Sequence, residues 1–292
     1  MPKPLIVITG KNGQLGWELQ QSSSQASESF DLLFTDKGML DLSKPESIAS
    51  FFQQYSPSYF INCAAYTAVD KAETEQELAY TINAGSVGAI AHECSKRNCR
   101  LINFSTDYVF NGNGTKPYET DTPTDPVNYY GYTKLAGEKL AMENHPDSII
   151  IRTSWVYSAH GHNFVKTMLR LMKEREEIKV VSDQVGSPTY AADLASAVWQ
   201  ICSALNSGDH RSGIYHYSNS GTLSWFEFAT AIRDMAGLSC RVLPIASSEY
   251  PTPAKRPFYS VMNTEKIIKG FNLSIPQWKD SLKKCLSQIT NQ

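Results

Sequence analysis

The sequence predicts an α/β fold: a doubly wound parallel sheet with a smaller C-terminal α/β domain. Three observations predict it. Short apolar strand patterns alternate with helical patterns through the first half of the chain, as expected for a parallel sheet that helices cover on both faces. A glycine-rich turn joins the first strand to the first helix. After Arg152 the alternation becomes less regular, and prolines gather toward the C-terminus.

The first half of the chain gives each element a local signal. The first strand is a run of apolar residues, and the first helix carries Leu15 and Leu19 on one face. Pro45 suits the first turn of the second helix. Polar residues bound the fourth strand on both sides. The expected elements are strand 5–9, helix 14–22, strand 31–35, helix 45–55, strand 59–63, helix 75–97, strand 100–105, helix 130–144 and strand 148–152.

The second half predicts a smaller unit beside the sheet. Its expected elements are helices 163–174, 190–204 and 223–236 and strands 178–181 and 213–217. The tail is rich in proline, which favours long loops there. We therefore expect a larger domain of residues 1–153 plus about 177–220, and a smaller one of about 154–176 plus 221–292.

Composition and charge exclude several classes of protein. The 292 residues are 41% hydrophobic and 19% charged, with a net charge of −2, so we expect no nucleic-acid or anionic-lipid partner. No apolar run reaches the roughly 18 residues that a membrane span needs. The six cysteines and six histidines lack metal-ligand spacing. We interpret the chain as a cytoplasmic protein with no membrane partner and no metal site.

The glycine-rich turn has the pattern G-x-x-G-x-x-G, formed by Gly10, Gly13 and Gly16. Glycine permits the tight turn, lets the backbone approach a pyrophosphate and lets the helix pack closely on the strand. Free N–H groups at the start of the helix then face the phosphates. A glycine pattern alone is a weak signal. Its position between a buried strand and a helix favours a dinucleotide-binding Rossmann fold over an ordinary strand–helix turn.

Asp36, at the end of the second strand, stands where an acidic residue binds the adenosine ribose. Such a carboxylate favours NAD. Lys37 follows it directly and Lys11 lies in the glycine-rich turn, so either lysine could pair with the 2′-phosphate of NADP. Both lysines fit a solvated surface role equally well. The sequence therefore leaves NADH and NADPH open.

Tyr130 and Lys134 form the second motif, Tyr-x-x-x-Lys. Tyrosine, with an ordinary pKa near 10, is a poor acid–base group at neutral pH, and we expect a lysine one helical turn away to lower that pKa. Segment 105–107 follows the fourth strand and offers a hydroxyl for a carbonyl oxygen. Tyr129 and Tyr132 have no lysine four positions on, so we expect them to pack. The two motifs together predict hydride transfer between a dinucleotide and a carbonyl.

Seven segments match the pattern of one known family. They are residues 10–19, 62–73, 105–110, 130–138, 152–157, 183–189 and 255–257. In these segments the chain resembles the extended short-chain dehydrogenase/reductases and, within them, the dTDP-4-dehydrorhamnose reductases. The resemblance spans nearly the whole chain. Thr-Asp-Tyr-Val-Phe at 106–110 together with Thr-Ser-Trp-Val-Tyr at 153–157 is far more specific than the glycine-rich turn.

The resemblance implies NAD(P)H-dependent reduction of the C4 carbonyl of dTDP-4-dehydro-L-rhamnose to dTDP-L-rhamnose, a precursor of cell-surface polysaccharide. The larger domain would bind the dinucleotide and the smaller one the nucleotide-sugar. The implied catalytic residues are Thr106, Tyr130 and Lys134. The cofactor-binding residues would be Gly10, Asn12, Gly13, Gln14, Leu15, Gly16, Asp36, Lys37, Asp41, Leu42, Asn62, Ala64, Ala65, Tyr66, Tyr130 and Lys134. The substrate-binding residues would be Thr67, Val69, Thr106, Asp107, Tyr108, Trp155 and Arg256.

We expect the chain from about Leu223 onward to close over the nucleotide-sugar. Arg256 lies in a proline-flanked loop, and its planar guanidinium suits a diphosphate. The alternative is a surface arginine that pairs with a nearby carboxylate.

Three questions stay open at this point. Some family members dimerise around magnesium held by carboxylates, and Glu18 matches one such position. Segment 189–192 carries alanine at the partner position, however, and the chain ends in Gln292, so magnesium is not supported, and monomer and homodimer both remain possible. The substrate could be another nucleotide 4-keto sugar. The chain could also be a non-catalytic regulatory subunit similar to the methionine adenosyltransferase β subunit, although the catalytic set is intact.

Overall fold

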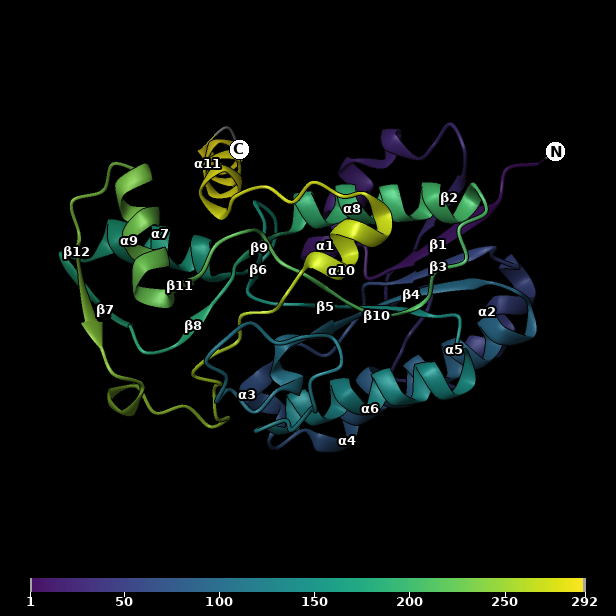
Figure 1. Ribbon diagram of the computed structural model, residues 1–292, viewed down its shortest axis with the longest axis horizontal. Coiled ribbons are helices and arrows are strands. Elements are labelled where there is room, and N and C mark those ends of the chain that lie inside the picture. The colour runs from purple at the N-terminus through teal and green to yellow at the C-terminus, as the bar shows by residue number, and fades with distance from the viewer. Residues whose placement is uncertain (1, 291–292) are drawn as a thin grey trace.

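The computed structural model, which describes residues 2–290, is built on a six-stranded parallel sheet (Figure 1). The strand order is β10-β5-β4-β3-β1-β2, and every neighbouring pair runs parallel. The strands are β1 (Leu5–Thr9), β2 (Asp31–Phe34), β3 (Tyr59–Asn62), β4 (Arg100–Thr106), β5 (Ile149–Thr153) and β10 (Gly213–Tyr217). This confirms the doubly wound sheet expected from the sequence.

Helices cover both faces of this sheet (Figure 1). One layer contains α1 (Gln14–Gln21), α8 (Ala191–Asn206) and α10 (Glu265–Phe271), and the other contains α2 (Ser47–Tyr55), α5 (Ser86–Lys96) and α6 (Tyr129–Asn144). Successive residues of β1 alternate between the two layers: Ile6 and Ile8 pack with the first, Val7 with the second. All three are fully buried. Burial on both faces explains why the strands are apolar throughout.

The prediction of a single long helix over residues 75–97 is wrong. The chain forms α4 (Gln76–Tyr80), a π-helical turn (Thr81–Gly85) and then α5, and a further short helix, α3 (Val69–Ala72), precedes them. Asn83 in the π-helical turn accepts from the backbone N–H of Tyr66 and donates to its carbonyl oxygen and to Thr133 Oγ1. These tertiary hydrogen bonds accompany the interruption, which helical periodicity does not reveal.

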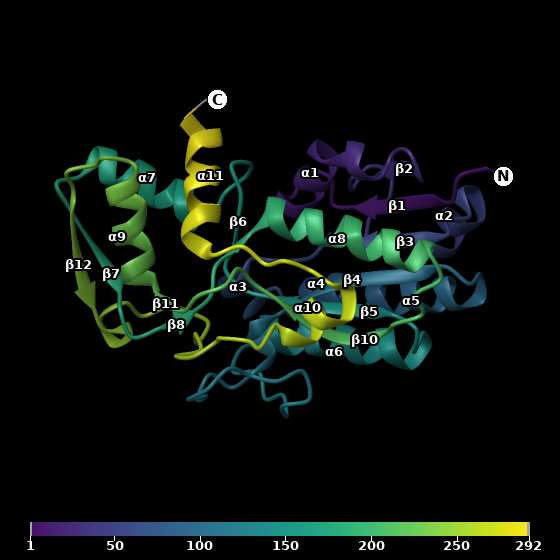
Figure 2. The same ribbon diagram turned by 45° about the horizontal axis from the view of Figure 1, so that its top comes forward.

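A smaller lobe lies beside the sheet (Figure 2). Its parallel strand pair, β7 (Glu177–Val181) and β12 (Arg241–Ile245), packs with α7 (Phe164–Glu174), α9 (Trp225–Met235) and α11 (Trp278–Thr290). Two short strand pairs lie near the junction of the lobes: β6 (Val156–Tyr157) with β9 (Thr189–Tyr190), and β8 (Val185–Gly186) with β11 (Leu223–Ser224). The remaining short helices are η1 (Ser23–Gln25), η3 (Asp107–Val109) and η4 (Ser247–Glu249).

Two segments lie with a different lobe from the one expected. β7, expected with the larger domain, pairs with β12 in the smaller lobe. α10, expected with the smaller domain, buries Ile267 and Phe271 in the core against the six-stranded sheet. The proline-rich tail also contains α10 and α11, where mainly loops were expected. Gln292 lies outside the described residues. Within residues 2–290, no helix is long and apolar enough to cross a membrane.

Candidate active site

A cleft of about 630 Å³ opens at the carboxyl ends of the parallel strands. Gly10 and Asp36 line it just beyond β1 and β2, and Asn62, Ser105 and Thr153 line it from the ends of β3, β4 and β5. Ligands of doubly wound sheets bind in this crevice. The expected site residues that line it are Gly10, Asn12, Gly13, Gln14, Leu15, Asp36, Lys37, Asp41, Leu42, Asn62, Ala64, Ala65, Thr67, Tyr130 and Lys134.

The other expected residues lie outside this lining. They are Gly16, Tyr66, Val69, Thr106, Asp107, Tyr108, Trp155 and Arg256. Ser105 also lines the cleft, although it was expected only as part of the segment that offers a hydroxyl, and ten further lining residues had no expected role: Leu40, Ser43, Cys63, Ile82, Phe104, Thr153, Val156, Gly161, His162 and Leu194. Ser105 had a detectable signal, because it stands beside Thr106 at the end of an apolar strand. Its hydroxyl is buried and has no hydrogen-bond partner among the described residues.

The glycine-rich turn forms a close-fitting cradle. Gly10 adopts a left-handed φ of +71°, which favours glycine. A Cβ on Gly16 would lie 2.2 Å from the carbonyl oxygen of Gly10, so only glycine fits where α1 meets the turn. A Cβ on Gly10 itself would lie 2.8 Å from the backbone nitrogen of Ala64. This cradle, which opens into the cleft ahead of the first turn of α1, fits the pyrophosphate of a dinucleotide.

Polar side chains hold the strand ends together under the cleft. Asn62 accepts a hydrogen bond from Thr9 Oγ1 at 2.7 Å and donates to Asn103 Oδ1 at 2.8 Å. The backbone N–H of Ala64 donates to the same threonine hydroxyl at 3.2 Å. Asn62 therefore links β1, β3 and β4, and Thr9 holds the loop that begins at Ala64.

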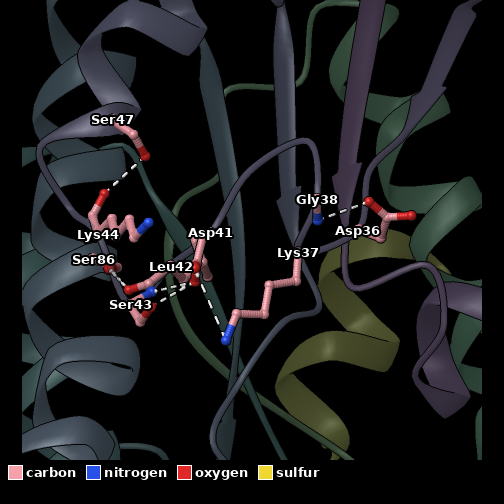
Figure 3. Close-up of polar contacts among 9 residues, drawn as sticks. All are labelled: Asp36, Lys37, Gly38, Asp41, Leu42, Ser43, Lys44, Ser47 and Ser86. Carbon is pink, nitrogen blue, oxygen red and sulfur yellow. Dashed lines mark hydrogen bonds and ion pairs between the residues drawn. The ribbon is translucent and has the colours of Figure 1, made fainter.

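Asp36 is paired with the lysine of the glycine-rich turn. Lys11 Nζ lies 2.8 Å from Asp36 Oδ2, whereas Asp36 Oδ1 accepts from the backbone N–H groups of Gly38 and Met39. The hydrogen bond from Lys11 lowers the pKa of Asp36. Figure 3 shows Lys37 extended away from Asp36 and toward another carboxylate.

Asp41 stabilises the loop that follows Asp36. The Oδ1 atom of Asp41 accepts hydrogen bonds from the N–H and the hydroxyl of Ser43 at 3.0 and 2.7 Å, and these bonds lower the pKa of Asp41 (Figure 3). Lys37 Nζ is 3.9 Å from Asp41 Oδ2 and its side chain is 79% exposed. Lys37 is therefore weakly held. The end of the cleft near Asp36 thus contains two lysines, and Lys11 already forms an ion pair with Asp36.

The helix α6 carries Tyr130 and Lys134 into the cleft. Asn128 caps it by accepting a hydrogen bond from the N–H of Gly131. Lys134 Nζ donates to the carbonyl oxygen of Phe104 at 2.7 Å, beside Ser105. As expected, Tyr129 and Tyr132 pack on each other, with ring centroids 5.4 Å apart, and neither lines the cleft.

The expected lowering of the Tyr130 pKa by Lys134 is wrong. Burial raises the pKa of Tyr130, the charge of Asp107 raises it further, and a hydrogen bond with Thr106 opposes both effects. Burial also lowers the pKa of Lys134 to about 8. The ammonium donates to Phe104 instead of compensating for the buried phenol. Tyr130 is consequently protonated at neutral pH.

Thr106 and Asp107 continue the site beyond the lining. Thr106 Oγ1 donates to Asp107 Oδ1 at 3.0 Å and accepts from the N–H of Tyr108 at 3.2 Å. Burial raises the pKa of Asp107 to about 6, against hydrogen bonds from Ser260 and Thr106 that lower it. Asp107 Oδ2 has no hydrogen-bond partner within the described part of the chain. The ring of Tyr108 meets that of Tyr130 edge-on at 5.7 Å.

Trp155 is held in an unusual conformation. It is a non-glycine residue with a φ of +48°, which L-residues rarely adopt. Its indole stacks on that of Trp225, with centroids 3.5 Å apart. A Cβ on Gly186 would lie 2.7 Å from the Trp155 ring. The ring is therefore packed against Gly186 and Trp225, and backbone strain of this kind often marks a ligand site.

Arg256 pairs with a carboxylate, as the alternative interpretation of the sequence had it. Its NH2 lies 2.9 Å from Asp70 Oδ2, and the backbone N–H of Ala254 donates to Asp70 Oδ1. Asn128 Nδ2 also donates to the carbonyl oxygen of Lys255. These contacts fasten the loop around residue 256 to α3 and to the start of α6.

Glu18, which matches a magnesium-binding position of some family members, is a buried residue in this structure. It is 4% exposed and accepts a hydrogen bond from Ser158 Oγ at 2.6 Å. Burial raises its pKa. Within residues 2–290, no three His, Cys, Asp or Glu side chains lie close enough together to hold a metal ion. Glu18 is thus held by a hydrogen bond from Ser158 within its own chain.

Comparison with known proteins gives full-length matches. The family model of the RmlD substrate binding domain matches residues 4–291. The chain is 44% identical to dTDP-4-dehydrorhamnose reductase of Escherichia coli and 41% identical to that of Salmonella typhimurium, in each case over 97% of both chains. It is also 42% identical to the spore coat polysaccharide biosynthesis protein SpsK of Bacillus subtilis, again over 97% of both.

Solved structures resemble the fold closely. A dTDP-4-dehydrorhamnose reductase of Bacillus anthracis, crystallised with NADP, superposes with a TM-score of 0.91 at 41% identity, over 98% of this chain and all of that one. A dTDP-4-dehydrorhamnose reductase from Clostridium acetobutylicum gives the same TM-score at 37% identity, over 98% of this chain and 99% of that one.

Proposed function

The chain belongs to the RmlD substrate-binding family, and from this membership we propose that it reduces dTDP-4-dehydro-L-rhamnose to dTDP-L-rhamnose with NADPH or NADH. One observation carries the proposal. Tyr130, its neighbour Thr106 and Lys134 gather at the end of β4, at the cleft that the glycine-rich turn also lines. A proton donor thus lies beside a dinucleotide cradle, as reduction of a carbonyl requires.

We assign the proton transfer to Tyr130. When bound in the cleft, the dihydronicotinamide supplies the hydride to C4. Tyr130 gives its phenolic proton to the C4 oxygen, which becomes the hydroxyl of the product. Burial raises the pKa of Tyr130, so the phenol is protonated before the reaction, and it becomes an effective acid only when the phenolate left behind is stabilised. Thr106, hydrogen-bonded to Tyr130, orients that proton.

Lys134 stabilises the phenolate that remains on Tyr130 after the transfer. It lies one helical turn away on α6, with its ammonium fixed at the carbonyl oxygen of Phe104. A buried cation favours a nearby anion more strongly than an exposed cation would. The lysine therefore matters more to the transition state than to the resting phenol.

The remaining assignments follow from the cleft. We propose that Asp36 binds the adenosine ribose and that Lys11 and Lys37 accommodate a 2′-phosphate. Thr67, Val69, Asp107, Tyr108, Trp155 and Arg256 would bind the nucleotide-sugar, with the smaller lobe covering it. NAD(P)H and nucleotide sugars are cytoplasmic metabolites, so we place the reaction in the cytoplasm, with the chain acting as a monomer or homodimer.

The test is turnover by the purified chain. NADPH or NADH oxidation is followed with dTDP-4-dehydrorhamnose and with other nucleotide 4-keto sugars, and the product is identified by mass spectrometry. We expect the highest kcat/KM with dTDP-4-dehydrorhamnose. Faster turnover of a different keto sugar would reassign the substrate. Cofactor binding with no turnover of any sugar would refute the reductase proposal in favour of a regulatory role.

A further inference from the structure

A buried ion pair lies behind the candidate active site. Arg152 on β5 donates two parallel hydrogen bonds to Glu138 on α6, from Nε to Oε1 at 2.9 Å and from NH2 to Oε2 at 2.7 Å. Both residues are 2% exposed. The guanidinium also lies over the ring of Phe110 and near the carbonyl oxygen of Thr120 and the imidazole of His216. The paired geometry fixes both orientation and distance.

The ion pair is aligned with the two catalytic residues. Tyr130, Lys134 and Glu138 follow one another at intervals of four along α6, so they lie on one face of the helix in successive turns. Adjacent turns are about 5.4 Å apart along the axis. Arg152 directly precedes Thr153, which lines the cleft. The ion pair therefore joins the helix that carries the catalytic pair to the strand that ends at the site.

Two glycines add to the fixation of α6 but do not replace the ion pair. A Cβ on Gly131 would lie 2.2 Å from the carbonyl oxygen of Tyr108, and one on Gly137 would lie 2.1 Å from that of Asn83. At these two glycines the backbone of α6 packs closely against η3 and the π-helical turn. Neither reaches β5. The Glu138–Arg152 pair supplies a directional bond from the helix to the central sheet.

The carboxylate also acts on the charge of Lys134. Burial lowers the pKa of Lys134 to about 8, and the Glu138 charge opposes this effect. The ion pair has a further ionisable neighbour in His216 on β10, whose Nε2 lies 3.5 Å from Arg152 NH1, and the charge of Asp107 in η3 acts on Tyr130. The pKa of His216 lies near 3, so it is neutral at working pH.

We propose that Glu138 is a positioning residue for the reduction: clamped by Arg152, it orients α6 over the cleft and keeps the ammonium of Lys134 charged. The inference rests on the proposed function, because it assigns Lys134 a role in the reaction. Its consequence is a specific dependence on pH. Without the carboxylate, the lysine loses its proton at lower pH, and a buried unpaired guanidinium adds repulsion.

The test compares kcat and KM across pH in three variants. Glu138→Gln keeps the shape and removes the charge. Glu138→Asp keeps the charge with a shorter reach. The double variant Glu138→Leu/Arg152→Met removes both charges, a replacement that cores often tolerate. The matched control is Glu93→Gln, which removes another buried carboxylate that pairs with arginine, on the neighbouring helix α5 and outside the cleft lining.

We expect Glu138→Gln to move the alkaline limb of kcat down by about one pH unit, which lowers kcat roughly 10-fold above that limb. KM for the sugar should change little. Glu138→Asp should restore the limb while kcat stays below wild type. If Glu138→Gln does not fold, the double variant Glu138→Leu/Arg152→Met tests the proposal instead, and its alkaline limb of kcat should also move to lower pH. If Glu138→Gln folds and the alkaline limb of its kcat is not shifted, the proposal is overturned. It is also overturned if kcat falls by the same factor at every pH and by as much as in Glu93→Gln.

Cofactor binding separates this inference from the proposed function. NADPH affinity, measured by fluorescence across pH, needs no sugar and should show the same alkaline shift in Glu138→Gln. A wild-type chain that binds NADPH and reduces no sugar would refute the reductase proposal. The pH dependence of binding would still decide whether Glu138 controls Lys134, and an identical dependence in wild type and variant would overturn that control.

Discussion

The ammonium nitrogen of Lys134 lies 2.7 Å from the carbonyl oxygen of Phe104, to which it donates a hydrogen bond. The bond anchors the lysine to the end of β4, one helical turn from Tyr130. Among the described residues, no hydrogen bond joins this ammonium to the phenol of Tyr130. The resting phenol stays protonated, and under the proposed function Lys134 would act on the phenolate that forms when the proton leaves.

Replacing Tyr130 by phenylalanine should remove the proton donor and leave the packing intact. We expect kcat to fall by roughly 10²-fold or more, the usual contribution of a general acid. NADPH affinity should change little, because the ring stays in place. Steady-state kinetics and a binding titration measure the two effects, with Tyr132→Phe as a control. Turnover near that of wild type would remove Tyr130 from the mechanism and direct attention to Tyr129.

The Asp36→Ala variant should weaken NADH more than NADPH. A carboxylate can accept from the free 2′-hydroxyl of NADH, and its removal also frees Lys11, 2.8 Å away, for the 2′-phosphate of NADPH. KM values for both cofactors decide the matter. Asp31→Ala, an exposed carboxylate at the start of the same strand, serves as control. Equal losses for the two cofactors would contradict the assignment.

Arg256→Ala should raise KM for the dTDP-sugar, with little change in the NADPH KM, because a guanidinium can bind two phosphate oxygens. Arg256→Lys should recover only part of the loss. Asp70→Asn is the matched control: it breaks the 2.9 Å ion pair but keeps the cation. A sugar KM within about twofold of wild type in Arg256→Ala, worth only about 0.4 kcal/mol, or equal effects in Arg256→Ala and Asp70→Asn, would leave Arg256 a structural role only.

Asp107 should make the chain less stable as pH rises. Its pKa is raised to about 6 in the folded chain, above the ordinary value near 3.9. The folded state therefore binds more protons than the unfolded state between these values, and the free energy of unfolding falls as pH rises through them. Asp107→Asn should remove this loss, which is up to about 3 kcal/mol above pH 6. Denaturant unfolding at pH 4 and pH 7.5 measures it, and an equal difference between variant and wild type at both values would contradict the prediction.

Gly16→Ala should destabilise the cradle. The new Cβ would lie 2.2 Å from the carbonyl oxygen of Gly10, a backbone atom that cannot move freely. Overpacking of this kind costs about 1–3 kcal/mol, and dinucleotide affinity should fall with it. Gly85→Ala is the control, because its Cβ meets no atom within 4 Å. Thermal unfolding compares the two, and similar melting temperatures would show that the turn adjusts.

The sheet and the cradle could be predicted because their signals are local. Strands buried on both faces must be apolar throughout, and the glycine-rich turn needs its residues at fixed spacing. The helix α11 also had a readable pattern, with Trp278, Leu282, Cys285 and Leu286 on its buried face, but the prolines around it favoured loops. Local patterns in the sequence therefore predicted both the carboxyl edge of the sheet and the cleft that lies there.

Tertiary pairings could not be predicted in the same way. Nothing local indicates that Lys11 rather than Lys37 meets Asp36, or that Asp70 meets Arg256 across the fold. The predicted lowering of the Tyr130 pKa was wrong for the same reason. The spacing places Lys134 one helical turn away, but only the fold shows that burial is the largest effect on this pKa. Directions of side chains and degrees of enclosure are properties of the assembled molecule.

The stacked indoles of Trp155 and Trp225 give the chain an optical signal of its own. Rings held nearly parallel at 3.5 Å should couple their strong electronic transitions, and we expect this coupling to give a band in the far-ultraviolet circular dichroism spectrum. Trp155 directly follows the segment that leaves the central sheet, and Trp225 begins α9 in the smaller lobe. The band therefore reports whether the two lobes keep their relative placement when ligands enter the cleft, without any attached dye.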